Sequence, residues 1–193
     1  MKKIKVRDMT ITAMFIALGV IFPYIFHTAQ ISGQMFLPMH IPVLLCGIIC
    51  GPFLGGICAI ATVPLCSVLT GMPPIYPMGT IMIFELVAYA VSAGILFRLI
   101  KKLKINLIAS LYITLIASML IGRGVYGLVA YIVYGVIGNG YAFKAFITSA
   151  FVTGLPGIAI QLALIPWLYI LLKKAKLIDV EPRKNTEPDT HKI

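Results

Sequence analysis

Long apolar runs separated by short polar stretches fill most of the chain. The runs have the length of helices and lack the apolar–polar alternation of barrel strands, so they predict membrane-spanning α-helices. We place these spans at Met9–Phe26, Ile41–Cys50, Phe53–Leu69, Met78–Phe97, Asn106–Ile137 and Gly154–Leu172. The pattern predicts an all-α integral membrane protein, with a six-helix domain over residues 9–172, a basic N-terminus (1–8) and a charged tail (173–193).

Two of these runs depart from the usual length of a span. The second is short, so we expect its helix to begin inside the preceding loop, near Leu37. The fifth would extend about 47 Å at roughly 1.5 Å per residue, against a hydrocarbon core of about 30 Å. It is therefore either one long tilted helix or a helix broken near Gly122-Arg123-Gly124.

Composition and charge placement agree with a membrane protein. The chain is 60% hydrophobic and only 11% charged, with a mean hydropathy of +1.01, which excludes an ordinary soluble domain. All lysines and arginines except Arg123 and Lys144 lie before the first span, at Arg98–Lys104, or after Leu172. Because basic residues near span ends face the cytoplasm, both termini are predicted to be cytoplasmic, and the net charge of +10 indicates no nucleic-acid partner.

Several catalytic motifs are absent from the sequence. No G-x-x-x-x-G-K-[ST] loop is present, so the chain is not expected to hydrolyse a nucleotide by itself. There is also no H-E-x-x-H or G-x-S-x-G motif, and we predict no enzyme activity. The four cysteines (Cys46, Cys50, Cys58 and Cys66) have no histidine at ligand spacing, so we interpret them as packing residues and predict no metal site.

Glu85 is the one acidic residue within the predicted membrane region, and Arg123 is the basic residue at a comparable depth. Charged groups in hydrocarbon are costly, so each is expected to have a partner or a function. Three interpretations are open: a buried structural ion pair, two groups flanking a polar cavity that binds substrate, or an arginine that snorkels to the outer headgroups and never meets Glu85.

The outer loops and outer helix ends supply further aromatic and amide side chains, which suit a small, partly apolar organic solute. An interfacial aromatic belt with ordinary loop polarity explains any one of them equally well. The predicted substrate-binding residues are Gln34, Phe36, His40, Met72, Tyr76, Glu85, Arg123, Tyr126 and Asn139.

Short motifs within the apolar runs resemble the substrate-binding S components of energy-coupling factor (ECF) vitamin importers. They are His40-Ile-Pro-Val-Leu-Leu-Cys-Gly, Gly71-Met-Pro-Pro, Phe84-Glu-Leu, Gly122-Arg123 and Gly154-Leu-Pro-Gly. The resemblance implies six helices that bind a vitamin from outside. It also implies a separate transmembrane T component and two ATPases that use ATP, while this chain binds no cofactor. The family's small-residue motif, which docks the T component, matches Ala13 and Ala17 on the first helix.

We therefore expect a multi-pass S component of the bacterial cytoplasmic membrane. Pantothenate is the first candidate ligand, followed by folate, cobalamin and queuosine precursors. An anionic ligand would use Arg123, so Arg123→Ala is predicted to abolish binding in a protein that still folds. The alternative is an autonomous secondary transporter driven by a proton or sodium gradient, and a membrane enzyme is the third possibility.

Overall fold

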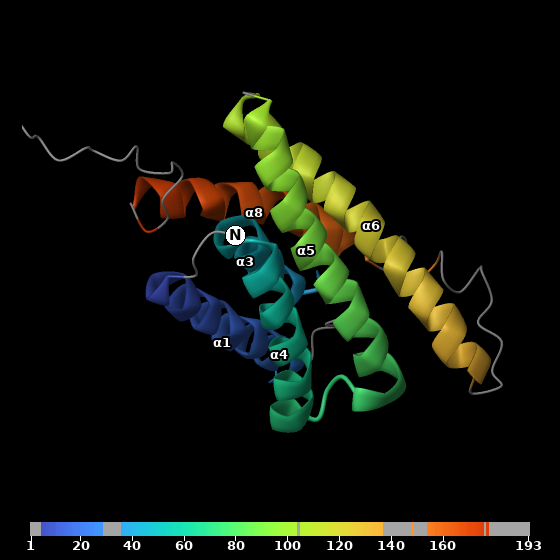
Figure 1. Ribbon diagram of the computed structural model, residues 1–193. Coiled ribbons are helices and arrows are strands. Elements are labelled where there is room, and N and C mark those ends of the chain that lie inside the picture. Colours follow the sequence, from blue (N-terminus) through green and yellow to red (C-terminus); the bar gives the residue numbers. More distant parts are fainter. Residues whose placement is uncertain are drawn as a thin grey trace, which may run out of the picture.

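The computed structural model describes residues 5–28, 36–103, 105–136, 148, 154–175 and 177. The described part is helical, as predicted, and Figure 1 shows its elements. They are α1 (Val6–Thr28), α3 (His40–Cys50), α4 (Pro52–Thr70), the short helical turn η1 (Ile75–Gly79), α5 (Thr80–Lys102), α6 (Leu107–Val136) and α8 (Leu155–Lys174).

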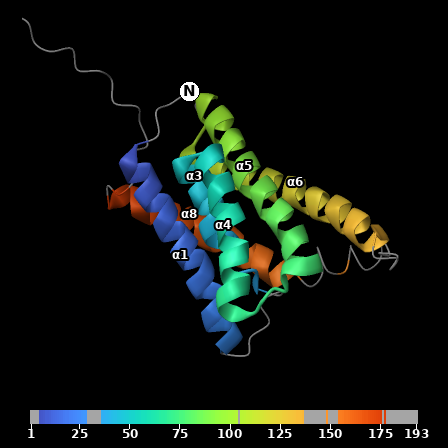
Figure 2. The same ribbon diagram turned by 60° about the horizontal axis from the view of Figure 1, so that its bottom comes forward.

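Helix α5 lies at the centre of the bundle, between α4 and α6 (Figure 1). It packs along α6, α4 and α3, whereas α1 packs against α4 and α3. Helices α5 and α6 lie close together near the turn that joins them and diverge toward their other ends in both views (Figures 1 and 2). The core therefore forms around α5 and α3, and α1 and α8 cover it from the sides.

Helix α3 is short because it is a core element. It has 11 residues, about 16 Å at roughly 1.5 Å per residue, and contacts α1, α4, α5 and α8. Every residue from His40 to Ile48 is buried. The other five helices are each long and apolar enough to cross a membrane, so a polytopic membrane protein is confirmed, whereas the count of six spans stays a prediction.

The expected start of this second helix near Leu37 is wrong, because α3 begins at His40. Leu37 has a φ of 50°, which a helix does not allow, and Pro38 follows it. A proline disfavours helical backbone in the residue before it, so the apolar run continues past the point where the helix can begin.

Helix α6 is continuous over its 30 residues, so of the two alternatives for this run the single long helix is confirmed and the helix broken near Gly122-Arg123-Gly124 is excluded. Gly122 serves packing instead: a Cβ there would lie 2.9 Å from the ring of Tyr89 on α5. The basic stretch that starts at Arg98 begins within the last turns of α5, where cations are favourable beside the free carbonyl groups.

Glycines allow the close packing of the α3–α4 hairpin. A Cβ on Gly47 would meet the backbone carbonyl of Ala90 on α5, and a Cβ on Gly55 would lie 2.7 Å from the Cα of Gly47. Three helices thus approach each other at Gly47, as small residues permit in membranes.

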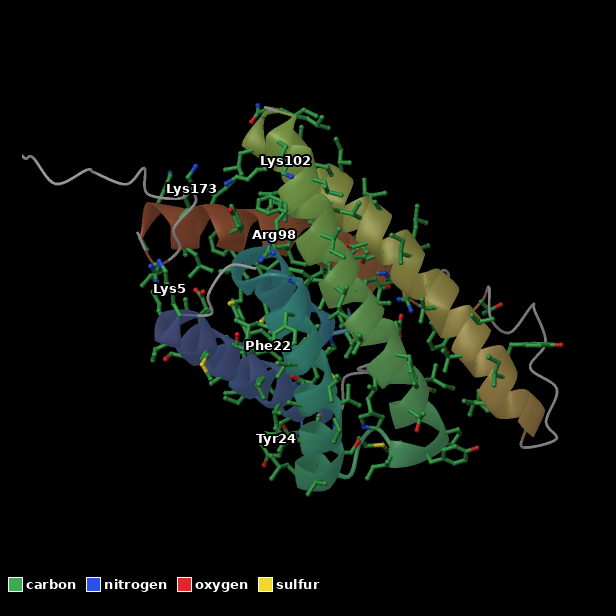
Figure 3. The ribbon with its side chains drawn as sticks, in the orientation of Figure 1. Lys5, Phe22, Tyr24, Arg98, Lys102 and Lys173 are labelled. Carbon is green, nitrogen blue, oxygen red and sulfur yellow. The ribbon has the colours of Figure 1, made fainter. Side chains whose placement is uncertain are left out.

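Basic side chains gather at one end of the bundle. Lys5, Arg98, Lys102 and Lys173 lie toward that end in Figure 3, and Tyr24 lies at the opposite end of α1. A guanidinium nitrogen of Arg7 donates a hydrogen bond of 2.6 Å to the carbonyl of Leu177. The start of α1 and the segment after α8 are therefore neighbours.

Candidate functional site

The turn between α4 and α5 is held by hydrogen bonds to both helices. Gly71, with a φ of 72°, caps α4 through its N–H and the carbonyl of Ser67. The Ser67 hydroxyl donates to the carbonyl of Pro73 at 2.5 Å, and the Thr80 hydroxyl donates to the carbonyl of Ile75 at 3.0 Å. These bonds fix where α5 begins, and Glu85 follows on its second turn.

Glu85 forms an ion pair with Arg123. Arg123 Nη1 lies 2.9 Å from Glu85 Oε1, and the two residues are only 5% and 2% exposed. The pair joins α5 to α6 in the packed interior. The interpretation in which Arg123 snorkels away from Glu85 is therefore wrong, because the two side chains meet.

His40 and Tyr89 complete a buried polar centre around this pair. His40 Nε2 lies 3.8 Å from Glu85 Oε1, which is too long for a hydrogen bond, so the ring lies beside the carboxylate without bonding to it. The rings of His40 and Tyr89 meet edge to face, with centroids 5.2 Å apart. Tyr89 also interacts with both Glu85 and Arg123. We call His40, Glu85, Tyr89 and Arg123, from α3, α5 and α6, the polar centre.

Several polar nitrogens of this centre have no hydrogen-bond partner among the described residues. Arg123 Nε and Nη2 are buried without a hydrogen bond, as are both ring nitrogens of His40. On α8, the amide nitrogen of Gln161 is also buried and unpartnered, and this residue is 1% exposed. Buried polar groups are normally satisfied, so the unpartnered nitrogens of His40 and Arg123 require an explanation.

The sequence of this chain matches a known protein family. The model of the family described as "ECF transporter, substrate-specific component" matches residues 7–169. The chain belongs to this family. No curated protein and no solved structure matches it.

As an ECF substrate-specific component, the chain is a substrate-binding transporter subunit in a family that is not an enzyme family. The matched region begins in α1 and ends within α8, so it includes the whole polar centre. The resemblance stated from short sequence motifs is confirmed.

Of the predicted binding residues, the structure brings His40, Glu85 and Arg123 together. Tyr126 is buried one turn further along α6, in an apolar cluster with Ile81 and Ala130. Met72 and Tyr76 lie in the turn between α4 and α5 and are 52% and 57% exposed.

Phe36 lies near α1, where its ring centroid is 5.6 Å from that of Phe26. Gln34 and Asn139 lie outside the described residues. The role of each predicted residue in binding a ligand stays a prediction.

Two buried polar residues were not among the predicted binding residues: Tyr89 of the polar centre and Gln161 on α8. Tyr89 lies four residues after Glu85 and therefore on the same helix face, a spacing that identifies it. Gln161 is the one amide within the apolar run of α8, and a polar side chain in such a run is a signal by itself.

The remaining predicted groups lie elsewhere in the bundle. Ala13 and Ala17 are exposed on α1. All four cysteines are free thiols, and Cys46, Cys58 and Cys66 are buried. Within the described residues, no group of three histidine, cysteine or acidic side chains is arranged to hold a metal ion.

Proposed function

We propose that this S component binds a water-soluble vitamin or vitamin precursor at the polar centre and delivers it for import. The observation that carries the proposal is the buried Glu85–Arg123 pair with unsatisfied donors beside it. In a purely structural ion pair, the protein itself also satisfies the remaining donors, whereas a binding site has groups that are free before the ligand arrives. The free nitrogens of His40 and Arg123 have this property.

The arrangement of the helices supports ligand binding at this place. The three helices that supply the polar centre come from separate parts of the chain, so a ligand there would contact α3, α5 and α6 at once. Binding sites between helices of a bundle are common, with an apolar wall and a few polar groups that orient the solute. Here Tyr89 and the cluster around Ile81 supply apolar surface.

Membership of the ECF family supports the proposed partner subunits and the proposed location in the membrane. The partners are a transmembrane T component and two ATPase subunits, and ATP is used by those ATPases rather than by this chain. The protein lies in the bacterial cytoplasmic membrane, with its basic end in the cytoplasm, as the bias of lysine and arginine predicts. Ala13 and Ala17 form the docking surface for the T component.

A thermal-shift screen of the detergent-purified chain tests the binding function. Pantothenate is the first candidate, followed by folate, cobalamin and queuosine precursors. A ligand at 100 times its Kd stabilises the folded state by about 2.7 kcal/mol, which is an easily measured shift. Cooperative melting that no vitamin or precursor alters would contradict the proposed function.

A further inference from the structure

We infer that the ligand carries a carboxylate, and that its two oxygens bind the free edge of the Arg123 guanidinium. The inference rests on the proposed function and specifies the chemical class of the substrate. It follows from which nitrogens of Arg123 are occupied and which are not.

One nitrogen of Arg123 is bonded to Glu85, and the two on the other edge of the guanidinium are free. Nη1 donates to Glu85 at 2.9 Å, while Nε and Nη2 are buried and have no partner in the described residues. Nε and Nη2 form one edge of the planar guanidinium, and their N–H groups point in nearly the same direction. This is the edge that binds the two oxygens of a carboxylate side by side.

In the described part of the chain, the oxygen acceptors of the polar centre are the Glu85 carboxylate and the Tyr89 hydroxyl, and neither is hydrogen-bonded to this edge. Arginine has donors only, so its free edge requires an acceptor. Glu85 is the one acidic residue of the membrane region, and its carboxylate already receives Nη1. His40 gives no excess of acceptors, because a neutral imidazole ring has one donor nitrogen and one acceptor nitrogen. A ligand that supplies oxygen acceptors would therefore complement the centre.

Charge favours a carboxylate over a phosphate. Glu85 and Arg123 together are neutral, so a bound carboxylate adds one negative charge and a phosphate adds nearly two. Buried charge is costly unless it is compensated, which favours the smaller addition.

A water molecule is the other acceptor small enough for this edge. The two occupants differ in a measurable way. If the ligand's carboxylate binds Arg123, replacing that carboxylate by an uncharged group weakens binding strongly. If water fills the edge, the acid and its uncharged analogue bind alike.

Matched ligand pairs on the unaltered chain test the inference directly. The pairs are pantothenate and panthenol, biotin and biotinamide, and nicotinate and nicotinamide. Riboflavin and thiamine serve as vitamins without a carboxylate, and pyridoxal phosphate with pyridoxal as a phosphate pair. We expect one acid to stabilise the chain, with a Kd about 100-fold lower than that of its uncharged partner.

A substitution then assigns the preference to Arg123. Arg123→Lys keeps the positive charge but lacks the two-pronged edge, so the preference for the acid is expected to fall to about tenfold or less. Lys102→Gln is the matched control, because it removes an exposed charge from the far end of α5 and is expected to change nothing. If Arg123→Lys does not fold, the comparison of acid and uncharged ligand on the unaltered chain still shows whether binding requires a carboxylate.

The outcomes separate this inference from the proposed function. Equal binding of an acid and its uncharged partner, or binding of riboflavin or thiamine alone, contradicts the inference that the ligand carries a carboxylate. The proposed S-component function is not contradicted by either result. Preference for pyridoxal phosphate over every acid overturns the inference as well. If no compound binds a chain that melts cooperatively, the proposed function is contradicted and the inference falls with it.

Discussion

At the residue scale, one ion pair explains how two charged residues, Glu85 and Arg123, can be buried within the helix bundle. Glu85 and Arg123 are both nearly fully buried and 2.9 Å apart, so each is the counter-charge of the other. Removing one partner leaves an uncompensated charge, which in proteins costs about 3–5 kcal/mol. The predicted foldability of Arg123→Ala therefore depends on how much stability the rest of the bundle provides.

A double-mutant cycle of Glu85→Gln and Arg123→Gln tests the coupling. Each single variant is expected to lose about 3–5 kcal/mol of unfolding free energy, because it leaves the other charge buried and unpaired. The double variant is expected to lose much less than the sum, since no unpaired charge remains. Denaturant titration of the purified chain measures all four proteins, and strictly additive losses would show that the two charges do not interact.

At the element scale, the sequence predicted the helices well but not their limits. Long apolar runs have few alternatives in a bilayer, so the spans could be located from the pattern alone. The start of α3 could not, because it depends on the positive φ of Leu37 rather than on hydropathy. The two glycines beside Arg123 left a break in α6 open, whereas in the structure Gly122 packs on the ring of Tyr89, a tertiary contact that the sequence does not reveal.

The same limit applies to the candidate site. The rarity of charge in the apolar runs identified Glu85 and Arg123, and their depths made a meeting possible. His40 was predicted from its place in the outer loop, whereas its position beside Glu85 depends on the packing of α3 against α5. Which nitrogens of Arg123 remain free is decided by side-chain geometry and cannot be predicted from a sequence.

Gly47 gives a prediction at this scale, because α3, α4 and α5 meet there. Gly47→Ala places a methyl group against the Ala90 carbonyl and is expected to cost about 1–3 kcal/mol through overpacking. Gly124→Ala is the matched control: no atom lies within 4 Å of its added Cβ, and alanine favours a helix by about 0.5–1 kcal/mol over glycine. Thermal melting should therefore shift in opposite directions, and equal shifts would contradict the packing argument.

At the scale of the whole molecule, the start of α1, the residue Leu177 after α8 and several basic side chains lie at the same end of the described structure. Arg7 bonds to the carbonyl of Leu177, and Lys5, Arg98 and Lys173 lie at the same end of the bundle (Figure 3). A protein with this distribution has one basic pole, which favours a single orientation in the membrane. It also places the start of α1, with Ala13 two turns further on, near that pole.

The exposed alanines of α1 make docking testable. We expect Ala13→Trp and Ala17→Trp to prevent co-purification with the T component and ATPases, because a bulky ring keeps two helices from close approach. Ligand binding to the isolated chain should not change, since both positions are exposed and outside the polar centre. Ala163→Trp, at an exposed position of α8, is the matched control. If the α1 variants still co-purify with the T component and ATPases, the docking surface is not at Ala13 and Ala17.

The source of energy for uptake separates the proposed function from a gradient-driven carrier. The chain lacks a nucleotide-binding motif, and its one acidic residue in the membrane region is held by Arg123 at 2.9 Å. A relay of acids for proton coupling is therefore not available, and the chain alone is expected to bind its ligand without accumulating it. In proteoliposomes, uptake should appear only when the T component, both ATPases and ATP are present. Accumulation by the chain alone under a proton or sodium gradient, lost in Glu85→Gln, would establish the carrier instead.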